Sequence, residues 1–360
     1  MGKKKIAVLF GGMSTEHSVS CVSATSVIKG LNKDKYDVIP VGLAENGDWL
    51  PYSGEYDNIK NGTWEEDARK ENNVPFTEEG CIMEPGIKAI RDCDIVFPVL
   101  HGAGGEDGTV QGLLELMKKP YVGCGVLASA VGMDKAYTKV VVAEKGIPQA
   151  KHVVARREDI LKDKNCYTQE ISEKLGFPCF VKPANSGSSV GVFKVGTKEE
   201  LPDILQEAQK YDRKIIVEEF IDGREIECAV MGNAEPKAAT PGEIKPSAEF
   251  YDFVDKYKSG SSITVIPAEI PQEKLEEVRS NALKIYKALD CSGLSRVDFF
   301  YERNTGRIIF NEINTLPGFT DISMYSKLWE AEGVDFSELL DRLVDYGFTR
   351  IQENERVVSK

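Results

Sequence analysis

The sequence predicts an α/β protein of two or three domains, with a parallel sheet near the N-terminus. Apolar stretches of strand length alternate with helical stretches over residues 5–117, which is typical of strands joined by crossover helices. The chain has 360 residues, enough to bury more than one hydrophobic core. Two apolar stretches near 296–300 and 310–314 carry charged residues and indicate further strands, far from the first unit.

The N-terminal unit is expected to contain three strands and two helices. The strands are predicted at 5–12, 37–43 and 94–100, and the helices at 18–31 and 109–117. A glycine-rich loop follows the first and the last of these strands. Because sites in parallel sheets lie beyond the carboxyl ends of the strands, we expect both loops to border a site.

The pattern changes near residues 123–127 and again near Asp222. The first change is followed by a predicted helix at 129–146, a strand around Val153, a helix ending near Gly176, strands at 179–183 and 190–195, an amphipathic helix at 199–210 and a strand at 215–220. The second is followed by a strand at 226–231, an irregular stretch at 238–264 and a helix at 272–289. We therefore expect domains at 1–123, 124–221 and 222–347, with a charged tail at 348–360.

Composition excludes several classes of protein. The chain is 41% hydrophobic and 29% charged with a net charge of −13, so we expect no binding to nucleic acid or to an anionic membrane. No apolar run approaches the roughly 20 residues of a membrane span, and the N-terminal one is too short for a secretory signal. Eight scattered cysteines without a CxxC pair predict reduced thiols in the cytoplasm. The three histidines lie far apart, which excludes a local histidine zinc motif.

The two charged strands carry the clearest chemistry. Residues two apart on a strand share a face, so Arg296 is expected beside Asp298, and Glu312 beside Asn314. Asp298, Glu312 and Asn314 offer the hard oxygen ligands that magnesium prefers. Arg296 is placed to stabilise negative charge that develops on oxygen. The alternative is a structural Arg–Asp pair with an asparagine that caps a turn.

A small-residue loop at 184–191 joins two predicted strands and follows Lys182. Its glycines and serines allow backbone N–H groups to approach phosphate oxygens, although no Walker A sequence is present. The alternative is a flexible turn. Lys135, at the start of a predicted helix, is a second lysine that could contact the phosphates of the same nucleotide. The alternative is that it lies in solvent at a capped helix end.

Three glutamates are candidates for recognition of adenosine. Glu218 and Glu219 end an apolar strand, and Glu225 follows a Gly-Arg turn, where solvent-exposed glutamates are also common. Glu16 lies near a helix N-terminus, where it caps the helix or binds an ammonium group. The nearby glycine pair lacks GxGxxG, so an NAD enzyme is a weak alternative.

Eight segments occur together in a specific order. They are Ile6–Ser20 with Gly-Gly-x-Ser-x-Glu, Leu100–Gly108, Met133-Asp134-Lys135, Lys182–Gly191, Glu218-Glu219, Tyr251–Tyr257, Arg296-Val297-Asp298 and Asn311–Gly318. In this order they resemble the D-alanine–D-alanine ligases of the ATP-grasp superfamily, including their vancomycin-resistance relatives, over residues 5–347. The resemblance implies three domains, with ATP between two α+β domains. It implies an acyl phosphate that a second D-amino acid attacks, giving a dipeptide for peptidoglycan precursors.

The resemblance also implies a role for each matching residue. Two magnesium or manganese ions would be bound by Asp298, Glu312 and Asn314. ATP would be bound by Lys135, Lys182, Ser186, Ser189, Val190, Glu218, Glu219 and Glu225. Glu16, supported by Ser188, would bind the ammonium of the first D-alanine, with His101 close by. Arg296 and the Gly318 N–H would form the oxyanion hole. Ser323 would bind the carboxylate of the second substrate.

A mobile loop near 246–264 is also implied by the resemblance. It would close over the site, so that Tyr257 meets Glu16 and Ser188 while Lys256 contacts substrate. An intact Lys256-Tyr257 pair and a loop without histidine argue against D-lactate.

Met324, next to Ser323, favours D-alanine, with D-serine as the alternative second substrate. Asp321-Ile322 and Ser295 depart from residues common in the family. A different carboxylate–amine ligase and a non-catalytic nucleotide-binding regulator are the competing classes. A homodimer in the cytoplasm is expected.

Overall fold

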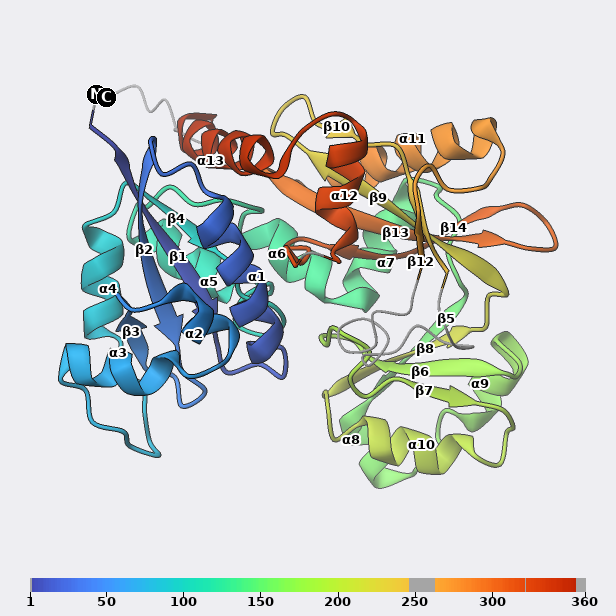
Figure 1. Cartoon of the computed structure of the whole chain (residues 1–360). Helices are drawn as coiled ribbons and strands as arrows, with labels where there is room; N and C mark the ends of the chain where they lie inside the picture. Colours follow the sequence, from blue (N-terminus) through green and yellow to red (C-terminus); the bar gives the residue numbers. More distant parts are fainter. Residues whose placement is uncertain (1, 246–262, 321, 354–360) are drawn as a thin grey trace, which may run out of the picture.

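The computed structural model describes residues 2–245, 263–320 and 322–353, and the strands in these residues form three sheets. Figure 1 shows one sheet in the N-terminal domain, one in the central region and one in the C-terminal region. Within the described residues, no helix is both long and apolar enough to cross a bilayer.

The N-terminal sheet has the order β3-β2-β1-β4. Strand β1 (Lys4–Gly11) pairs in parallel with β2 (Tyr36–Leu43) and with β4 (Ile95–Pro98), which confirms the predicted parallel unit. The edge strand β3 (Trp49–Pro51) is antiparallel and was not predicted, because three residues carry too little periodicity. Helix α1 (His17–Gly30) follows the carboxyl end of β1.

Four more helices belong to this domain: α2 (Tyr56–Lys60), α3 (Trp64–Asn72), α4 (Glu84–Arg91) and α5 (Thr109–Leu116). Only α5 was predicted. The indole of Trp64 is 1% exposed and meets the Phe10 ring edge-to-face at 4.8 Å between centroids. A single large aromatic side chain therefore anchors α3 to the sheet.

The helix predicted at 129–146 is two helices, α6 (Val126–Met133) and α7 (Lys135–Glu144). They meet at Asp134, whose backbone is extended and whose carboxylate accepts the N–H groups of Ala136 at 3.1 Å and Tyr137 at 3.2 Å. Asp134 thus caps α7, and this local preference overrides the continuous helical pattern. The break places Lys135 at the first position of α7.

The central sheet is antiparallel, with the order β5-β8-β6-β7. Its strands are β5 (His152–Arg156), β8 (Lys214–Glu219), β6 (Cys179–Pro183) and β7 (Phe193–Val195), and its helices are α8 (Arg157–Lys162), α9 (Thr168–Lys174) and α10 (Leu201–Ala208). Strand β7 starts three residues later than predicted. The preceding residues Ser188, Ser189 and Gly191 have positive φ, which is incompatible with a strand.

The C-terminal sheet has the order β12-β11-β9-β13-β14, with β10 also paired to β9. Its strands are β9 (Gly223–Met231), β10 (Lys237–Ala238), β11 (Gly242–Lys245), β12 (Ile263–Val265), β13 (Leu294–Glu302) and β14 (Ile308–Asn314). The described parts of the stretch predicted to be irregular therefore contain strands β10, β11 and part of β12. Helix α11 (Gln272–Ala288) packs against this sheet as its apolar spacing predicted.

Two C-terminal helices, α12 (Met324–Ala331) and α13 (Phe336–Glu353), were not predicted. Helix α13 contacts α1 and β4, so the chain returns to the N-terminal domain (Figure 1). Buried side chains of α12 and α13 share one hydrophobic cluster with β1, β4 and α1. The residues of the central sheet form a separate cluster. The N-terminal domain and the C-terminal helices are therefore held together by a common core.

Candidate active site

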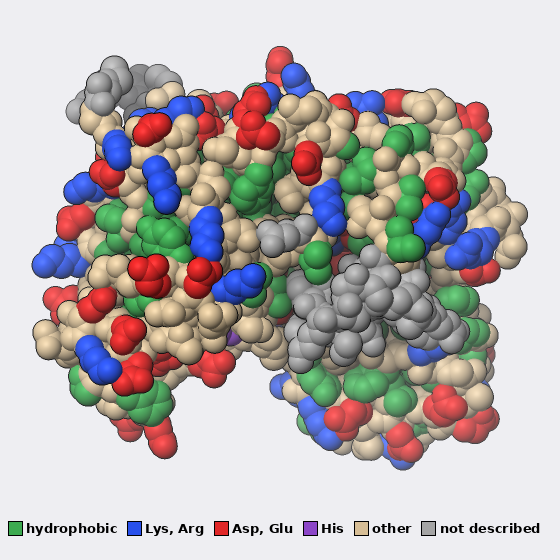
Figure 2. Space-filling view, in the orientation of Figure 1, with side chains coloured by type: hydrophobic (Ala, Val, Ile, Leu, Met, Phe, Trp, Pro, Cys, Tyr) green, Lys and Arg blue, Asp and Glu red, His purple; other side chains and the backbone are tan. Residues whose placement is uncertain are grey.

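A cavity of about 1050 Å³ lies between the central and the C-terminal sheets. It is lined from strands β6, β8, β9, β11, β13 and β14, and from the 186–189 loop. Ten of the predicted site residues line it: Lys135, Lys182, Ser186, Ser188, Ser189, Glu218, Glu219, Glu225, Asp298 and Glu312. On the face shown in Figure 2, acidic and basic side chains are interspersed over the surface. Charges of both signs also line the cavity itself.

Three carboxylates lie in one row across the C-terminal sheet. Asp298 on β13 is opposite Glu227 on β9 and Glu312 on β14. Arg296 donates from Nε and Nη2 to Asp298 at 2.8 and 2.7 Å, and its Nε lies 2.9 Å from Glu227 Oε2. Asn314 Nδ2 donates to Asp298 Oδ2 at 2.9 Å. The predicted sharing of faces is confirmed, while Glu227 was missed because its partners lie on other strands.

The donor set fits a divalent cation. Within the described ranges, no group of three or more His, Cys, Asp or Glu side chains is arranged to bind a metal. Asp298, Glu312 and Asn314 supply two carboxylates and an amide on paired strands, a set that usually binds magnesium together with substrate oxygens. Cationic side chains border these carboxylates: Arg296 on Asp298, and Lys135 with its Nζ 3.4 Å from Glu312 Oε2.

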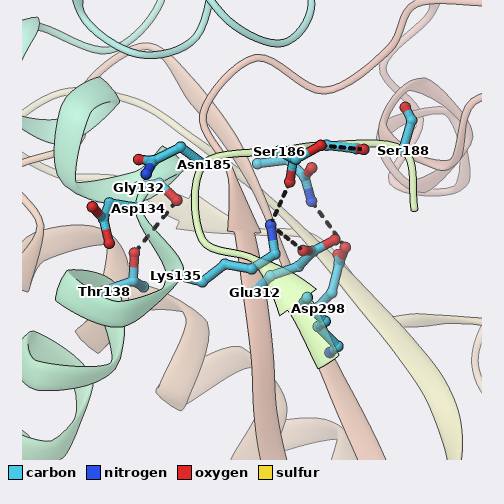
Figure 3. Close-up of polar contacts among 12 residues, drawn as sticks. Gly132, Asp134, Lys135, Thr138, Asn185, Ser186, Ser188, Asp298 and Glu312 are labelled. Atoms are coloured by element: carbon cyan, nitrogen blue, oxygen red, sulfur yellow. Dashed lines mark hydrogen bonds and ion pairs between the residues drawn. The ribbon is translucent and has the colours of Figure 1, made fainter. Parts of the chain in front are cut away.

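Lysines concentrate at one end of the cavity. Figure 3 shows the Lys135 amino group between Ser186 and Glu312, and its Nζ donates to the Ser186 carbonyl at 2.7 Å. Lys182 Nζ lies 2.5 Å from Glu218 Oε2, and Lys139 Nζ lies 2.6 Å from Glu218 Oε1. Burial of Glu218 opposes its ionisation, but the two lysines outweigh burial and lower its pKa far below the usual range. This carboxylate therefore stays ionised.

Lys139 was missed at the sequence level. Its side chain is 2% exposed, and its Nζ lies against Glu218. It follows Lys135 by four residues on α7, so helical spacing places both on one face, and this was the available signal.

The loop from Ser186 to Gly191 is held in an uncommon conformation. Ser188 and Ser189 have φ of 49° and 59°, in the left-handed region that residues other than glycine rarely adopt. Within the loop, Val190 N–H donates to the Gly187 carbonyl at 3.1 Å, and Ser186 Oγ to the Val190 carbonyl at 3.3 Å. Successive backbone N–H groups in such turns form anion-binding concavities. The geometry favours phosphate binding over the alternative of a simple flexible turn.

Glu16 does not cap α1. Its side chain is 5% exposed, makes no capping hydrogen bond, and accepts a hydrogen bond from Ser188 Oγ instead. Two glycines crowd its carboxylate, because a Cβ on Gly102 or Gly187 would lie 2.5 or 2.7 Å from Glu16 Oε2. The N-terminal domain thus meets the 186–191 loop at Glu16.

Glu106 is a second carboxyl group beside Glu16 and is partly buried. Its Oε2 accepts the Gly102 N–H at 2.9 Å. Burial, and then the negative charge of Glu16, raise the pKa of Glu106 to about 8. The sequence pattern includes this residue in a motif but gives it no role. Its environment is evident only when Glu16 is placed next to it.

His101 and Ser323 are both engaged in internal hydrogen bonds. His101 is buried, its Nε2 lies 3.0 Å from Ser23 Oγ, and burial lowers its pKa to about 4. Ser323 Oγ accepts the Thr320 N–H at 3.0 Å. A Cβ on Gly318 would lie 3.0 Å from Ser323 Oγ, so these two predicted residues are adjacent. Arg296, Gly318, Ser323 and His101 are not among the residues that line the cavity itself.

The remaining predictions have mixed outcomes. Glu219 lies at the end of β8, where its Oε1 accepts the Lys151 N–H at 2.8 Å. Glu225 lies within β9 and not after a turn, because the Gly-Arg pair before it already pairs in the sheet. Lys256 and Tyr257 belong to residues 246–262, which lie outside the described residues.

The cavity between two antiparallel sheets, with lysines at one end, defines an ATP-grasp enzyme. Residues 5–124 match the family model "D-ala D-ala ligase N-terminus", and residues 141–345 match "D-ala D-ala ligase C-terminus". The chain therefore belongs to the D-alanine–D-alanine ligase family.

Similar proteins cover nearly the whole chain. The D-alanine–D-alanine ligase of Acetivibrio thermocellus is 49% identical over 98% of this chain and 98% of its own length. That of Thermoanaerobacter sp. is 52% identical over 96% of each. Among solved structures, VanG D-Ala:D-Ser ligase from Enterococcus faecalis is 41% identical, with a TM-score of 0.81 over 96% of this chain and 100% of that chain. The D-alanine–D-alanine ligase of Coxiella burnetii is 34% identical, with a TM-score of 0.82 over 98% and 96%.

Proposed function

We propose that this chain joins two D-alanine molecules to D-alanyl-D-alanine at the expense of ATP, through an acyl-phosphate intermediate. The observation that carries this function is the meeting of two groups of residues at one cavity. A lysine-rich cluster that suits phosphates adjoins the buried Glu16, which suits an ammonium group. Relatives about half identical over nearly the full chain, named D-alanine–D-alanine ligases, support the same activity.

The lysine-rich end of the cavity, which we call the nucleotide end, binds and orients ATP. Lys135, Lys182 and the backbone N–H groups of residues 186–190 bind the phosphates, and Glu218, Glu219 and Glu225 bind adenosine. Asp298, Glu312 and Asn314 would hold two Mg²⁺ or Mn²⁺ ions, which would neutralise negative charge on the phosphate oxygens. Phosphoryl transfer depends mainly on such positioning and charge neutralisation, so the protein needs no nucleophile of its own.

The region around Glu16 and Ser188, which we call the amino-acid end, orients the two D-alanines. Glu16, held by Ser188, binds the ammonium of the first D-alanine, whose carboxylate oxygen attacks the γ-phosphorus while ADP leaves. The amine of the second D-alanine then attacks the resulting carbonyl carbon, and phosphate leaves. Arg296 and the Gly318 N–H stabilise the oxyanion of the tetrahedral intermediate. Ser323 binds the carboxylate of the second D-alanine.

The alternative second substrate is D-serine, because the chain is also similar to VanG D-Ala:D-Ser ligase. Met324 was expected to favour a methyl group. Its side chain is 4% exposed and belongs to the core cluster with Leu328. Because Met324 packs into the core, we propose that selection for D-alanine depends on all the residues around Ser323 and not on Met324 alone. The homodimer and the cytoplasmic location remain expectations drawn from the family resemblance.

The test of the function is ATP-dependent phosphate release with Mg²⁺ and D-alanine, with the product identified by mass. D-serine and D-lactate are then offered together with D-alanine. We expect D-alanyl-D-alanine from D-alanine alone. Turnover that begins only when D-serine is added, with a mixed dipeptide as product, would overturn the assignment of the second substrate. No phosphate release with any D-amino acid would favour a nucleotide-binding regulator.

Arg296→Ala tests the proposed oxyanion role. Loss of one such donor typically lowers kcat about 100- to 1000-fold, and we expect at least this loss because Arg296 is also paired with two carboxylates. ATP affinity, measured by calorimetry, should change little. Arg342→Ala, on an exposed ion pair of α13, is the matched control and should retain full turnover. An equal loss of ATP affinity in Arg296→Ala would contradict the oxyanion role.

A further inference from the structure

One buried hydroxyl group connects three segments of the chain that border the amino-acid end of the site. Ser23 lies on α1 and is fully buried. Its Oγ is 3.0 Å from Nε2 of His101, which follows β4. It also accepts the N–H of Phe319 at 3.3 Å, across 296 residues of sequence. The hydroxyl is thus shared between the N-terminal domain and the 314–320 segment.

These contacts hold the main chain on both sides of Gly318. The Leu316 backbone, before Gly318, is close enough to the His101 ring to favour its protonation, and Ser23 accepts the Phe319 N–H, after Gly318. Pro317 has no N–H group, so the Gly318 N–H is the first amide donor that follows the Leu316 carbonyl. A Cβ at Gly318 would lie 3.9 Å from Ser23 Oγ, which shows how closely α1 approaches this peptide.

The proposed ammonium-binding residue, Glu16, directly precedes the same helix. Helix α1 begins at His17, directly after Glu16. Seven residues of α-helix span about 10 Å, so α1 sets a fixed spacing between Glu16 and Ser23. The other buried serine of this face, Ser20, bonds within the N-terminal domain, to the Gly11 N–H and the Val99 carbonyl. Ser23 alone of the two reaches the 314–320 segment.

We propose that Ser23 is a positioning residue of the ligase reaction: by hydrogen-bonding to His101 and to Phe319 it fixes the Gly318 N–H relative to the pocket of Glu16. The inference rests on the proposed function, because the Gly318 N–H matters only as an oxyanion donor. It also gives His101 a role that does not require direct contact with substrate. Displacement of a catalytic group by about 1 Å is sufficient to lower a rate by up to about 100-fold.

The competing explanation is packing. The Phe319 ring is 1% exposed and meets Phe97 and Tyr325 edge-to-face at 5.8 and 5.9 Å, which also restrains this segment. Two variants separate the explanations. Ser23→Ala removes the hydroxyl and leaves a small void, whereas Ser23→Cys fills the volume with a weak hydrogen-bonding group. Ser26→Ala is the control on the same helix, because the Ser26 hydroxyl donates to the Val22 carbonyl of its own helix.

The first measurement does not depend on activity. Hydrogen–deuterium exchange is measured on the full chain without substrates. In Ser23→Ala and in Ser23→Cys, the peptide that contains Phe319 should exchange faster than in the wild type. Exchange in Ser26→Ala should equal that of the wild type. Unchanged exchange in both Ser23 variants would overturn the proposal, whatever the chain catalyses.

The second measurement is steady-state kinetics with ATP and D-alanine. We expect kcat to fall about 10- to 100-fold in both Ser23 variants, with the KM for ATP unchanged. His101→Ala should lower kcat similarly, and the double variant with Ser23→Ala should lose little more, because the two residues act as one unit. Full activity of Ser23→Cys, or faster exchange without any loss of kcat, would reduce Ser23 to a packing residue. A wild type without ligase activity would sink the proposed function while leaving the exchange result interpretable.

Discussion

Glu218 is buried and Glu106 is partly buried, at opposite ends of the proposed site, and their pKa values shift in opposite directions. Glu218 lies between Lys182 and Lys139, which lower its pKa despite its burial. Glu106 has the Gly102 N–H as a neutral partner and Glu16 as a negative neighbour, so burial and repulsion raise its pKa to about 8. The same side chain is thus fixed as an anion at one end and favours protonation at the other.

The difference shows what each end is built to receive. At the proposed nucleotide end, Lys139 and Lys182 are paired with Glu218 in the absence of ligand. The proposed function makes this pairing a form of preorganisation for phosphates. At the proposed amino-acid end, the carboxyl groups of Glu16 and Glu106 lie close together. The proposed function places the ammonium group of the first D-alanine beside Glu16.

Among variants that test the difference between the two ends, Glu16→Gln is expected to have the largest effect on activity. Removing the charge leaves the ammonium of the first D-alanine without its ion partner in a desolvated site, a loss of about 2–5 kcal/mol. The kcat/KM for D-alanine should therefore fall by roughly 30- to 5000-fold. Nucleotide affinity, measured by calorimetry, should stay the same. Glu144→Gln, exposed at the end of α7, is the control. A parallel loss of ATP affinity would mean that the two ends are not separate.

Lys139→Met is expected to act on the nucleotide end and on stability. Removing one partner of a buried ion pair typically costs about 3–5 kcal/mol, and the Lys139 side chain is 2% exposed. Denaturant unfolding should show this loss, and the KM for ATP should rise because Glu218 is left to Lys182 alone. Adding Glu218→Gln should restore part of the stability but not the ATP affinity. If Lys139→Met alone changes neither quantity, Lys139 has no part in preorganisation.

Glu106→Gln should give the smallest effect, visible in the pH dependence of stability. The folded pKa, about 8, lies above the ordinary value of 4.5, so the folded wild type binds a proton more tightly than the unfolded chain. The stability that this provides is complete below about pH 4.5 and is lost as the pH rises to about 8. The Tm of Glu106→Gln relative to the wild type should therefore increase between pH 5 and pH 8. A constant difference would contradict the raised pKa.

Much of the site could be predicted because its chemistry is local in sequence. The alternation of residues along β13 and β14 is sufficient to place Arg296 with Asp298 and Glu312 with Asn314. Residues with distant partners could not be found in this way. Glu227 meets Asp298 only through strand pairing, and the charge around Glu106 depends on Glu16, ninety positions earlier.

The sequence by itself determined the parallel N-terminal unit, the acidic and basic faces of the two charged strands, and the ordered motifs of the family, because periodicity and spacing act over a few residues. Tertiary structure alone decided that α12 and α13 complete the core of the N-terminal domain, that Lys139 meets Glu218, and that Ser23 meets Phe319. The division of one helical pattern into α6 and α7 is local, because the Asp134 carboxylate caps α7, and hydrophobic periodicity alone did not reveal it. Burial and charge arise from contacts between distant segments, and these contacts exist only once the chain has folded.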